Sequence, residues 1–104
     1  MHVRISKGRY PRELHVEVST RLAASAVSLI PAICRLPGCI GYYAGADVDS
    51  CTMVNVSVWD TLEQAQAMAT LPEMGALARE FIALGVEFER PIVNYPVMWQ
   101  LPGD

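Results

Sequence analysis

The segment Thr52–Trp59 carries the side chains whose types and spacing are best suited to chemistry. Its polarity alternates from residue to residue, which predicts a β-strand whose successive side chains point to opposite faces. One face is wholly apolar and consists of Val54, Val56 and Val58. The other face consists of Met53, Asn55, Ser57 and Trp59. This second face could place an amide, a hydroxyl and an indole beside one ligand.

Asn55 and Trp59 are the candidate catalytic residues of this strand. A polar amide in the middle of a strand is disfavoured by β-propensity, and it is costly to bury without a hydrogen-bond partner. The Asn55 amide is therefore expected to bond either a ligand or the neighbouring backbone. Trp59 either contacts the same ligand or only fills the core at the strand end. An apolar pocket with a few convergent polar groups is the usual form of a small-molecule site.

Residues 2–6 alternate in the same way and predict another strand of the sheet. His2, Arg4 and Ser6 share its polar face, opposite Val3 and Ile5. His2 and Arg4 are candidate substrate-binding residues, and a histidine can act as a base near neutral pH. A solvated side chain near the terminus is the alternative for His2.

The remaining candidate substrate-binding residues come from several elements, and they are Tyr42, Met53, Ser57, Met74 and Phe81. Methionine is flexible and polarizable, so Met53 and Met74 would make an adaptable pocket wall. Tyr42 could line the pocket or an interface. Ordinary core packing is the alternative for these residues.

Apolar periodicity and turn residues predict the elements that position these side chains. A stripe with spacings of three and four residues predicts one helix over residues 12–35. Pro31 lies inside this helix and is expected to kink or break it, because proline lacks a backbone donor. Residues 39–45 predict a strand that forms an antiparallel hairpin with Thr52–Trp59 through a polar turn at residues 47–50.

The second half of the chain predicts two helices in succession. The first covers residues 61–69, with Asp60 as its N-cap and Glu63 placed for the reciprocal bond. The second starts near Pro72, which is tolerated in a first turn. Gly85 can adopt a left-handed conformation and is expected to end this helix.

Residues 88–101 predict a final extended strand, in which Pro91 and Pro96 favour an edge position or bulges. The elements then follow the order strand, helix, strand, strand, helix pair, strand. This is the order of the ferredoxin-like split β-α-β-β-α-β fold of the α+β class. That fold is a four-stranded antiparallel sheet with helices on one face. A single domain over residues 1–104 accounts for the chain.

The valine face of Thr52–Trp59 needs a cover of its own. Burying one valine is worth about 1.5–3 kcal/mol, and two-fold dimers are the commonest assembly. We therefore expect a homodimer through the sheet faces, with Val54, Val56 and Val58 in the interface. The composition agrees, since the chain, with 52% hydrophobic and 18% charged residues, is more apolar and less charged than an average soluble domain. The surplus of apolar residues suggests a second surface to bury.

Composition argues against several other classes. The net charge is −3 and the eight basic residues are scattered, so no nucleic-acid partner is expected. The most apolar stretch, residues 22–34, is too short to span a bilayer, and no apolar signal-peptide region precedes it. We therefore expect a cytoplasmic protein with no membrane partner. Cys34, Cys39 and Cys51 lack metal-site spacing and are expected to be buried, inert thiols.

Three stretches, residues 36–42, 56–65 and 73–84, carry a family resemblance when they are taken together. They resemble the antibiotic biosynthesis monooxygenase family of the dimeric α+β barrel superfamily. The resemblance covers essentially the whole chain in element order, and residues 56–65 around Trp59 are its most specific part. It implies a dimeric α+β barrel in which each subunit keeps a pocket between its own sheet and helices.

The resemblance also implies an activity. Asn55 and Trp59 are similar to an asparagine and a tryptophan on the third strand of the cofactor-free oxygenases of this family. It implies a monooxygenase that needs no cofactor or metal and acts on a small aromatic or phenolic, polyketide-like substrate. An ionised phenol lying flat against Trp59 would give an electron to O₂, while Asn55 would bond the developing oxyanion. His2 and Arg4 stand on the strand where these oxygenases often carry an asparagine.

Two further interpretations remain open. One is a non-catalytic dimer that binds a small apolar ligand or serves in assembly or regulation. The other is an isomerase-like or haem-linked role, although no histidine stands on residues 74–84, where haem-degrading relatives hold iron. An enzyme should surround one cavity beside Trp59 with His2, Arg4, Asn55 or Tyr42. A purely structural dimer should fill that space with Leu14, Val18, Leu77 and Phe81.

Overall fold

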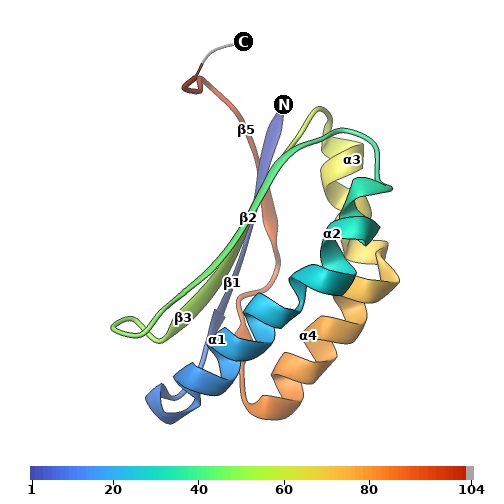
Figure 1. Ribbon diagram of the computed structural model, residues 1–104. Coiled ribbons are helices and arrows are strands. Elements are labelled where there is room, and N and C mark those ends of the chain that lie inside the picture. The colour runs from blue at the N-terminus through green and yellow to red at the C-terminus, as the bar shows by residue number, and fades with distance from the viewer. Residues whose placement is uncertain (103–104) are drawn as a thin grey trace.

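The helices and strands form two layers, with every helix on the same face of one antiparallel sheet (Figure 1). The structure is a computed structural model, and it describes residues 1–102. The strands are β1 (His2–Arg9), β2 (Cys39–Asp47), β3 (Thr52–Trp59), β4 (Glu87–Phe88) and β5 (Val93–Pro96). The helices are α1 (His15–Ala24), α2 (Ala26–Cys34), α3 (Leu62–Ala67) and α4 (Pro72–Leu84), with short 3₁₀ turns η1 (Arg12–Leu14) and η2 (Met68–Thr70).

The sheet runs in the order β2–β3–β1, and β4 and β5 both pair with the remaining side of β1. Together β4 and β5 occupy the fourth position of the predicted sheet, so the split β-α-β-β-α-β fold is confirmed. The single strand predicted over residues 88–101 is wrong in its extent, because the chain leaves the ladder between β4 and β5 and again after Pro96. Pro91 lies in the gap and has no N–H for the ladder.

Residues that pair across the sheet place their side chains on the same face, so the face under the helices is built of rows. Two central rows carry polar side chains, which are Tyr42, Ser57, Arg4 and Asn94 in one row and Asn55 and Ser6 in the next. We call these the polar rows. The row next to Ser57 contains Trp59. On the opposite side, the row next to Asn55 contains Met53 and Phe88.

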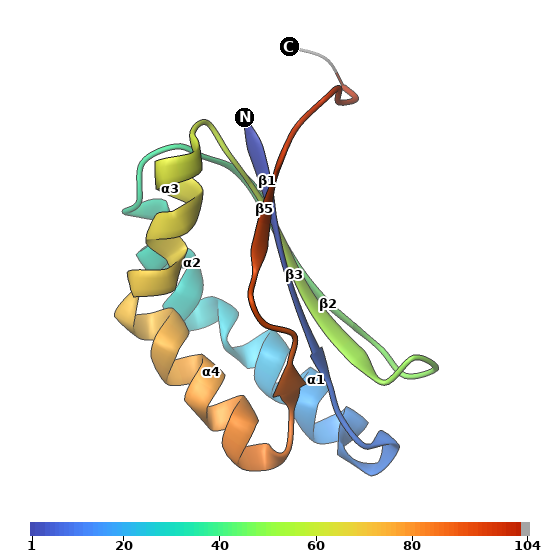
Figure 2. The ribbon, with the colours of Figure 1, turned by 180° about the vertical axis from the view of Figure 1, so that it is seen from behind.

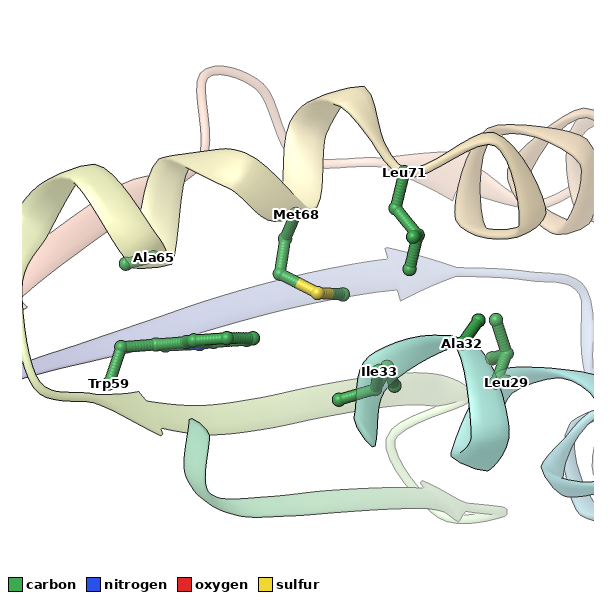
Figure 3. Close-up of a cluster of buried hydrophobic side chains, with 7 residues drawn as sticks. All are labelled: Leu29, Ala32, Ile33, Trp59, Ala65, Met68 and Leu71. Atoms are coloured by element: carbon green, nitrogen blue, oxygen red, sulfur yellow. The ribbon is translucent and has the colours of Figure 1, made fainter. Parts of the chain in front are cut away.

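Two clusters of buried side chains join the layers. The first contains Trp59 at one end, together with Leu29, Ala32, Ile33, Ala65, Met68 and Leu71 (Figure 3). The second contains Tyr10, Val18, Leu22, Met53, Phe81 and Val86. Leu77 of α4 packs against both clusters. The polar rows therefore lie between two dry regions of the core.

The helix predicted over residues 12–35 is broken at Ser25, with a bend of 43° between its halves. The alternative of a break at Pro31 is wrong, since Pro31 lies inside the continuous α2. The Ser25 hydroxyl donates a hydrogen bond to the Leu22 carbonyl at 2.6 Å, and such back-bonding bends helices. The bend lets α1 cover the second cluster while α2 covers the first.

No single helix within residues 1–102 is long and apolar enough to cross a membrane. The segments Arg12–Ala24 and Ala26–Cys34 meet the requirement only as a bent pair, by length and composition alone. Their apolar residues Val18, Leu22 and Leu29 are buried in the two clusters. The apolar stripe of this pair is thus the inner surface of the helical layer.

The start of α3 differs from the prediction by one residue. Thr61 is the N-cap instead of Asp60, and its reciprocal partner is Gln64 instead of Glu63. Thr61 Oγ1 accepts the Gln64 N–H at 3.2 Å, and Gln64 Oε1 accepts the Thr61 N–H at 3.1 Å. This capping box fixes the turn that leads from β3 into the helical layer.

The end of α4 agrees with the prediction. Gly85 has a left-handed φ of 119°, and the Val86 N–H returns to the Phe81 carbonyl at 3.0 Å. Val86 is buried in the second cluster, so the closing turn also anchors the chain that enters β4.

We predict that Gly38→Ala destabilises the fold by two separable effects. Gly38 has a φ of 86°, and a Cβ there would overlap the side-chain amide of Gln64. The left-handed backbone and the disturbed cap together should lower the free energy of unfolding by about 2–3 kcal/mol in urea denaturation. In a Gln64→Ala background only the backbone cost of about 1–2 kcal/mol should remain. An equal loss in both backgrounds would contradict the coupling.

Candidate functional site

The polar rows face a cavity of about 60 Å³ between the sheet and α4. The sheet contributes a polar lining made of Arg4, Ser6, Tyr42, Asn55 and Ser57. The helical layer contributes an apolar wall made of Met68, Met74, Leu77, Ala78 and Phe81. Met53, Phe88, Arg90 and Ile92 complete the lining. A few convergent polar groups against an apolar wall are typical of a small-molecule site.

All the predicted site residues except His2 and Trp59 line this cavity. Arg4, Asn55 and Tyr42 lie around one space. Leu77 and Phe81 form part of its wall and do not fill it. Leu14 and Val18 belong to the second cluster. The catalytic and binding roles of the lining residues stay predictions.

Asn55 lies at the centre of the polar rows, between Ala44 of β2 and Ser6 of β1. Its side chain is half-buried and forms no side-chain hydrogen bond with any residue in the range 1–102. A buried amide without a partner costs about 1–3 kcal/mol. The cavity leaves this amide reachable for a ligand or a water molecule, which removes that cost.

Trp59 does not line the cavity, and the expectation that a substrate lies flat against it needs correction. Its side chain is 0% exposed, and the ring lies along β3 beneath Ala65 of α3 (Figure 3). The indole Nε1–H donates a hydrogen bond to Ser57 Oγ at 2.8 Å. Ser57 does line the cavity and keeps its own proton for a second partner. Trp59 can therefore act on the site only by positioning Ser57.

His2 also lies outside the cavity lining. It pairs with Trp59 in the row at the end of the sheet, one row beyond the cavity. Its Nδ1 atom is buried and has no hydrogen-bond partner within the described chain. The predicted contact of His2 with a substrate is thus not supported by its position, because the row of Trp59 is closed over by the first cluster.

Arg4 and Tyr42 flank Ser57 on opposite sides in one polar row. Burial lowers the pKa of Arg4, an effect that Tyr42 opposes and the charge of Arg90 increases. Arg4 nevertheless stays charged at neutral pH, as arginine does in proteins. Burial raises the pKa of Tyr42 to about 12, although the charge of Arg4 opposes the shift. Tyr42 is therefore a neutral hydrogen-bonding phenol and not a base.

Arg90 is the functional candidate that the sequence did not reveal. It lies in the connector between β4 and β5, which periodicity alone could not separate from a continuous strand. The side chain is exposed, contacts the Phe88 ring at 5.1 Å and lines the cavity. The sequence did contain one signal for it. Arg90 directly precedes Pro91, and a proline can interrupt the hydrogen-bond ladder of a strand.

The cavity thus combines two guanidinium groups, an amide, hydroxyl groups and an apolar wall. Its lining, drawn entirely from the described part of the chain, contains no carboxylate and no imidazole. Such a site favours an electron-rich or anionic group and can stabilise developing negative charge on oxygen. A proton lost by the ligand would have to pass to solvent, because no lining residue is a ready base.

Metal-ligand geometry is absent from residues 1–102, where no three His, Cys, Asp or Glu side chains could hold an ion together. The predicted burial of all three cysteines is wrong for Cys34, which is exposed at the end of α2. Cys39 and Cys51 are partly buried, and all three are free thiols.

We predict that Tyr42 is the last tyrosine to ionise in an ultraviolet absorbance titration of the folded protein. The step near pH 12 should be missing in Tyr42→Phe and retained in Tyr43→Phe, whose side chain lies on the open face of the sheet. The folded chain holds this proton more tightly than the unfolded chain, whose tyrosines ionise near pH ~10. Stability should therefore fall between these two pH values in the wild type more than in Tyr42→Phe. Loss of an earlier step in Tyr42→Phe would contradict the assignment.

Solved structures of other proteins identify the fold. A candidate antibiotic biosynthesis monooxygenase from Deinococcus radiodurans aligns over 97% of this chain and 96% of its own, with a TM-score of 0.73 and 17% identity. A variant of SnoaB, a cofactor-independent oxygenase from Streptomyces nogalater, aligns over 98% of both chains, with a TM-score of 0.68 and 17% identity. A candidate antibiotic biosynthesis monooxygenase from Nitrosomonas europaea aligns over 95% of this chain and 100% of its own, with a TM-score of 0.69 and 15% identity.

No family model and no curated protein matches the sequence. Identities this low establish the fold and not the activity. The chain has the fold of the antibiotic biosynthesis monooxygenases, which confirms the resemblance found in the sequence.

Proposed function

We propose that this chain is a cofactor-independent monooxygenase that acts on a small aromatic or phenolic, polyketide-like substrate in the cavity beneath α4. The observation that carries the proposal is the accessible Asn55 amide, which faces an apolar wall beside the charged Arg4. The fold supports the proposal, because SnoaB, a cofactor-independent oxygenase, shares it.

The proposed reaction starts from the ionised substrate. A phenolate or enolate passes one electron to O₂, and the resulting carbon radical and superoxide combine to form a carbon–oxygen bond. The peroxide takes up a proton and then loses water together with the hydrogen of that carbon, which leaves a carbonyl group. One oxygen atom ends in the product and the other in water, and the substrate supplies all the electrons.

Each polar group of the cavity has a task in this scheme. Arg4 stabilises the phenolate and so favours its formation without a protein base. The Asn55 amide donates a hydrogen bond to the oxyanion, an electrostatic contribution that is often the largest in such reactions. Ser57, held by Trp59 at 2.8 Å, can donate a second bond. Tyr42 adds a neutral phenol and leaves the charge balance unchanged.

Substrate entry must widen the cavity. Its volume of about 60 Å³ is well below the ~150 Å³ of a cavity that holds benzene. Met68 and Met74 form part of the wall, and methionine repacks readily because its side chain is flexible. The exposed connector that carries Arg90 can also give way. Compact substrates should therefore enter more easily than extended polycyclic ones.

We predict that Asn55→Ala lowers kcat for oxygen uptake by about 10²–10³-fold, the usual cost of removing one oxyanion donor. Oxygen consumption would be measured with a panel of anthrone-like and naphthol-like phenols. The control is Thr52→Ala, on the same strand but at the end of its opposite face and outside the cavity. Thermal unfolding of both variants should match the wild type, so that a loss of rate reports on chemistry.

Two results would contradict the proposal, the first for the role of Asn55 and the second for the oxygenase activity. Uptake that survives Asn55→Ala would remove Asn55 from the mechanism. Ligand-induced stabilisation of the wild type without any oxygen uptake would favour the alternative, a dimeric domain that binds small ligands without chemistry.

We also propose that two copies of the chain associate through their sheet faces. The helices cover one face of the sheet and leave the other bare in both views (Figures 1 and 2). The bare face carries Val3, Ile5, Tyr43, Val54, Val56, Val58, Val93 and Tyr95. Its members from the outer strands are largely exposed, at 69% for Tyr43 and 51% for Tyr95. An apolar patch of this extent is typical of an interface.

We predict that Val56→Lys converts the protein from dimer to monomer, because Val56 lies between Tyr43 and Ile5 near the middle of the bare face. Light scattering coupled to gel filtration would measure the mass. The matched control is Val27→Lys, which changes a valine that is 83% exposed on α2 and should leave the mass unchanged. A wild type that runs as a monomer would refute the proposed interface.

A further inference from the structure

Two arginines share the cavity without an acidic partner. The ion pairs within residues 1–102 involve Arg9, Arg21 and Arg35. Neither Arg4 nor Arg90 has a carboxylate oxygen of the described chain within 4.0 Å. The lining supplies no negative charge either. The cavity therefore carries two unbalanced positive charges.

Most hydrogen-bond donors of these arginines have no partner among residues 1–102. A guanidinium group has five N–H donors. Arg4 forms one long side-chain bond, from Nη1 to Asn94 Oδ1 at 3.4 Å. Arg90 forms one, from Nη1 to the Glu89 backbone carbonyl at 3.0 Å. The remaining donors of both groups are available to a ligand with several acceptor oxygens.

The two charges are close enough to affect one another, since the charge of Arg90 contributes to the lowered pKa of Arg4. Arg4 is half-buried on the sheet, whereas Arg90 is exposed on the connector. Bringing like charges together at a partly dry site is unfavourable, and a bound anion offsets that cost. The forked geometry of guanidinium suits the two oxygens of a carboxylate.

On the assumption that the proposed function holds, we propose that the substrate carries a carboxylate in addition to its phenol. The carboxylate would be bound by Arg90 together with donors of Arg4, whose charge also stabilises the ionised phenol at the Asn55 amide. The two cations then balance two anions, and the apolar wall of α4 covers the ring. The small cavity favours a single-ring phenolic acid.

The experiment compares two probes of nearly equal size, meta-hydroxybenzoate and its neutral amide, meta-hydroxybenzamide. Isothermal titration calorimetry with the wild type should show the acid binding about ten- to a hundredfold more tightly, the usual range for hydrogen bonds to charged groups. Arg90→Met should remove most of this preference. This variant is expected to fold normally, because Arg90 is exposed on the connector. Arg4→Met is the second test, with its fold checked by circular dichroism.

The matched control is Arg79→Met, which removes an exposed arginine of α4 that does not line the cavity and should keep the full preference. Equal affinities for acid and amide, or no binding of either, would overturn the proposed carboxylate. So would a preference that persists in Arg90→Met and in folded Arg4→Met. Oxygen uptake with neutral phenols alone would overturn it while leaving the oxygenase function intact. Arginine-dependent binding of the acid, with no oxygen uptake from any phenol, would support the anion site and refute the oxygenase.

Discussion

Buried polar groups need partners, and this requirement governs the middle of the sheet. An amide or hydroxyl left without one costs about 1–3 kcal/mol, and an uncompensated charge costs more. The bond from Trp59 to Ser57 satisfies one such group. Within residues 1–102, Asn55 has no side-chain partner, and the one side-chain bond of Arg4 is the long bond to Asn94. Complete closure of α4 over the polar rows would strand these groups. The cavity between the two apolar clusters keeps these polar groups accessible to a ligand or to water.

The strands divide polarity between their faces in the opposite way to an ordinary two-layer domain. On β3 the helix-facing side includes Asn55 and Ser57, while the outward side carries three valines, with Thr52 at its end. A lone domain would place the valines under the helices. The observed arrangement agrees with the two proposals made above, a ligand on the helix-facing side and a second subunit on the outward side. Both uses depend on the same register, because a slip of one residue would exchange the two faces.

Much of this architecture could be predicted because it is local. Alternation on β3 correctly grouped Asn55 with Ser57, and the element order predicted the fold. Placement errors arose where tertiary contacts decide between local alternatives. The first helix breaks at the back-bonded Ser25, whereas the sequence indicated a kink or break at Pro31.

The site itself was only partly predictable for the same reason. Trp59 shares a face with Asn55, but α3 lies directly over its ring and removes it from the cavity. No pattern in the sequence predicts which row of sheet residues a helix will cover. Arg90 was missed because it belongs to an interruption of a strand, and interruptions have no periodicity to detect.

The exposed connector between β4 and β5 has a kinetic consequence. The chain carries a formal net charge of −3, so at long range it repels anions. Salt screens that repulsion beyond about 10 Å, and within this distance an anion near the cavity also interacts with the positive charge of Arg90. The encounter rate of an anion would then be set mainly by exposed Arg90, and its residence time by half-buried Arg4. Capture and retention would thus be adjustable independently, by substitutions on two different elements of the fold.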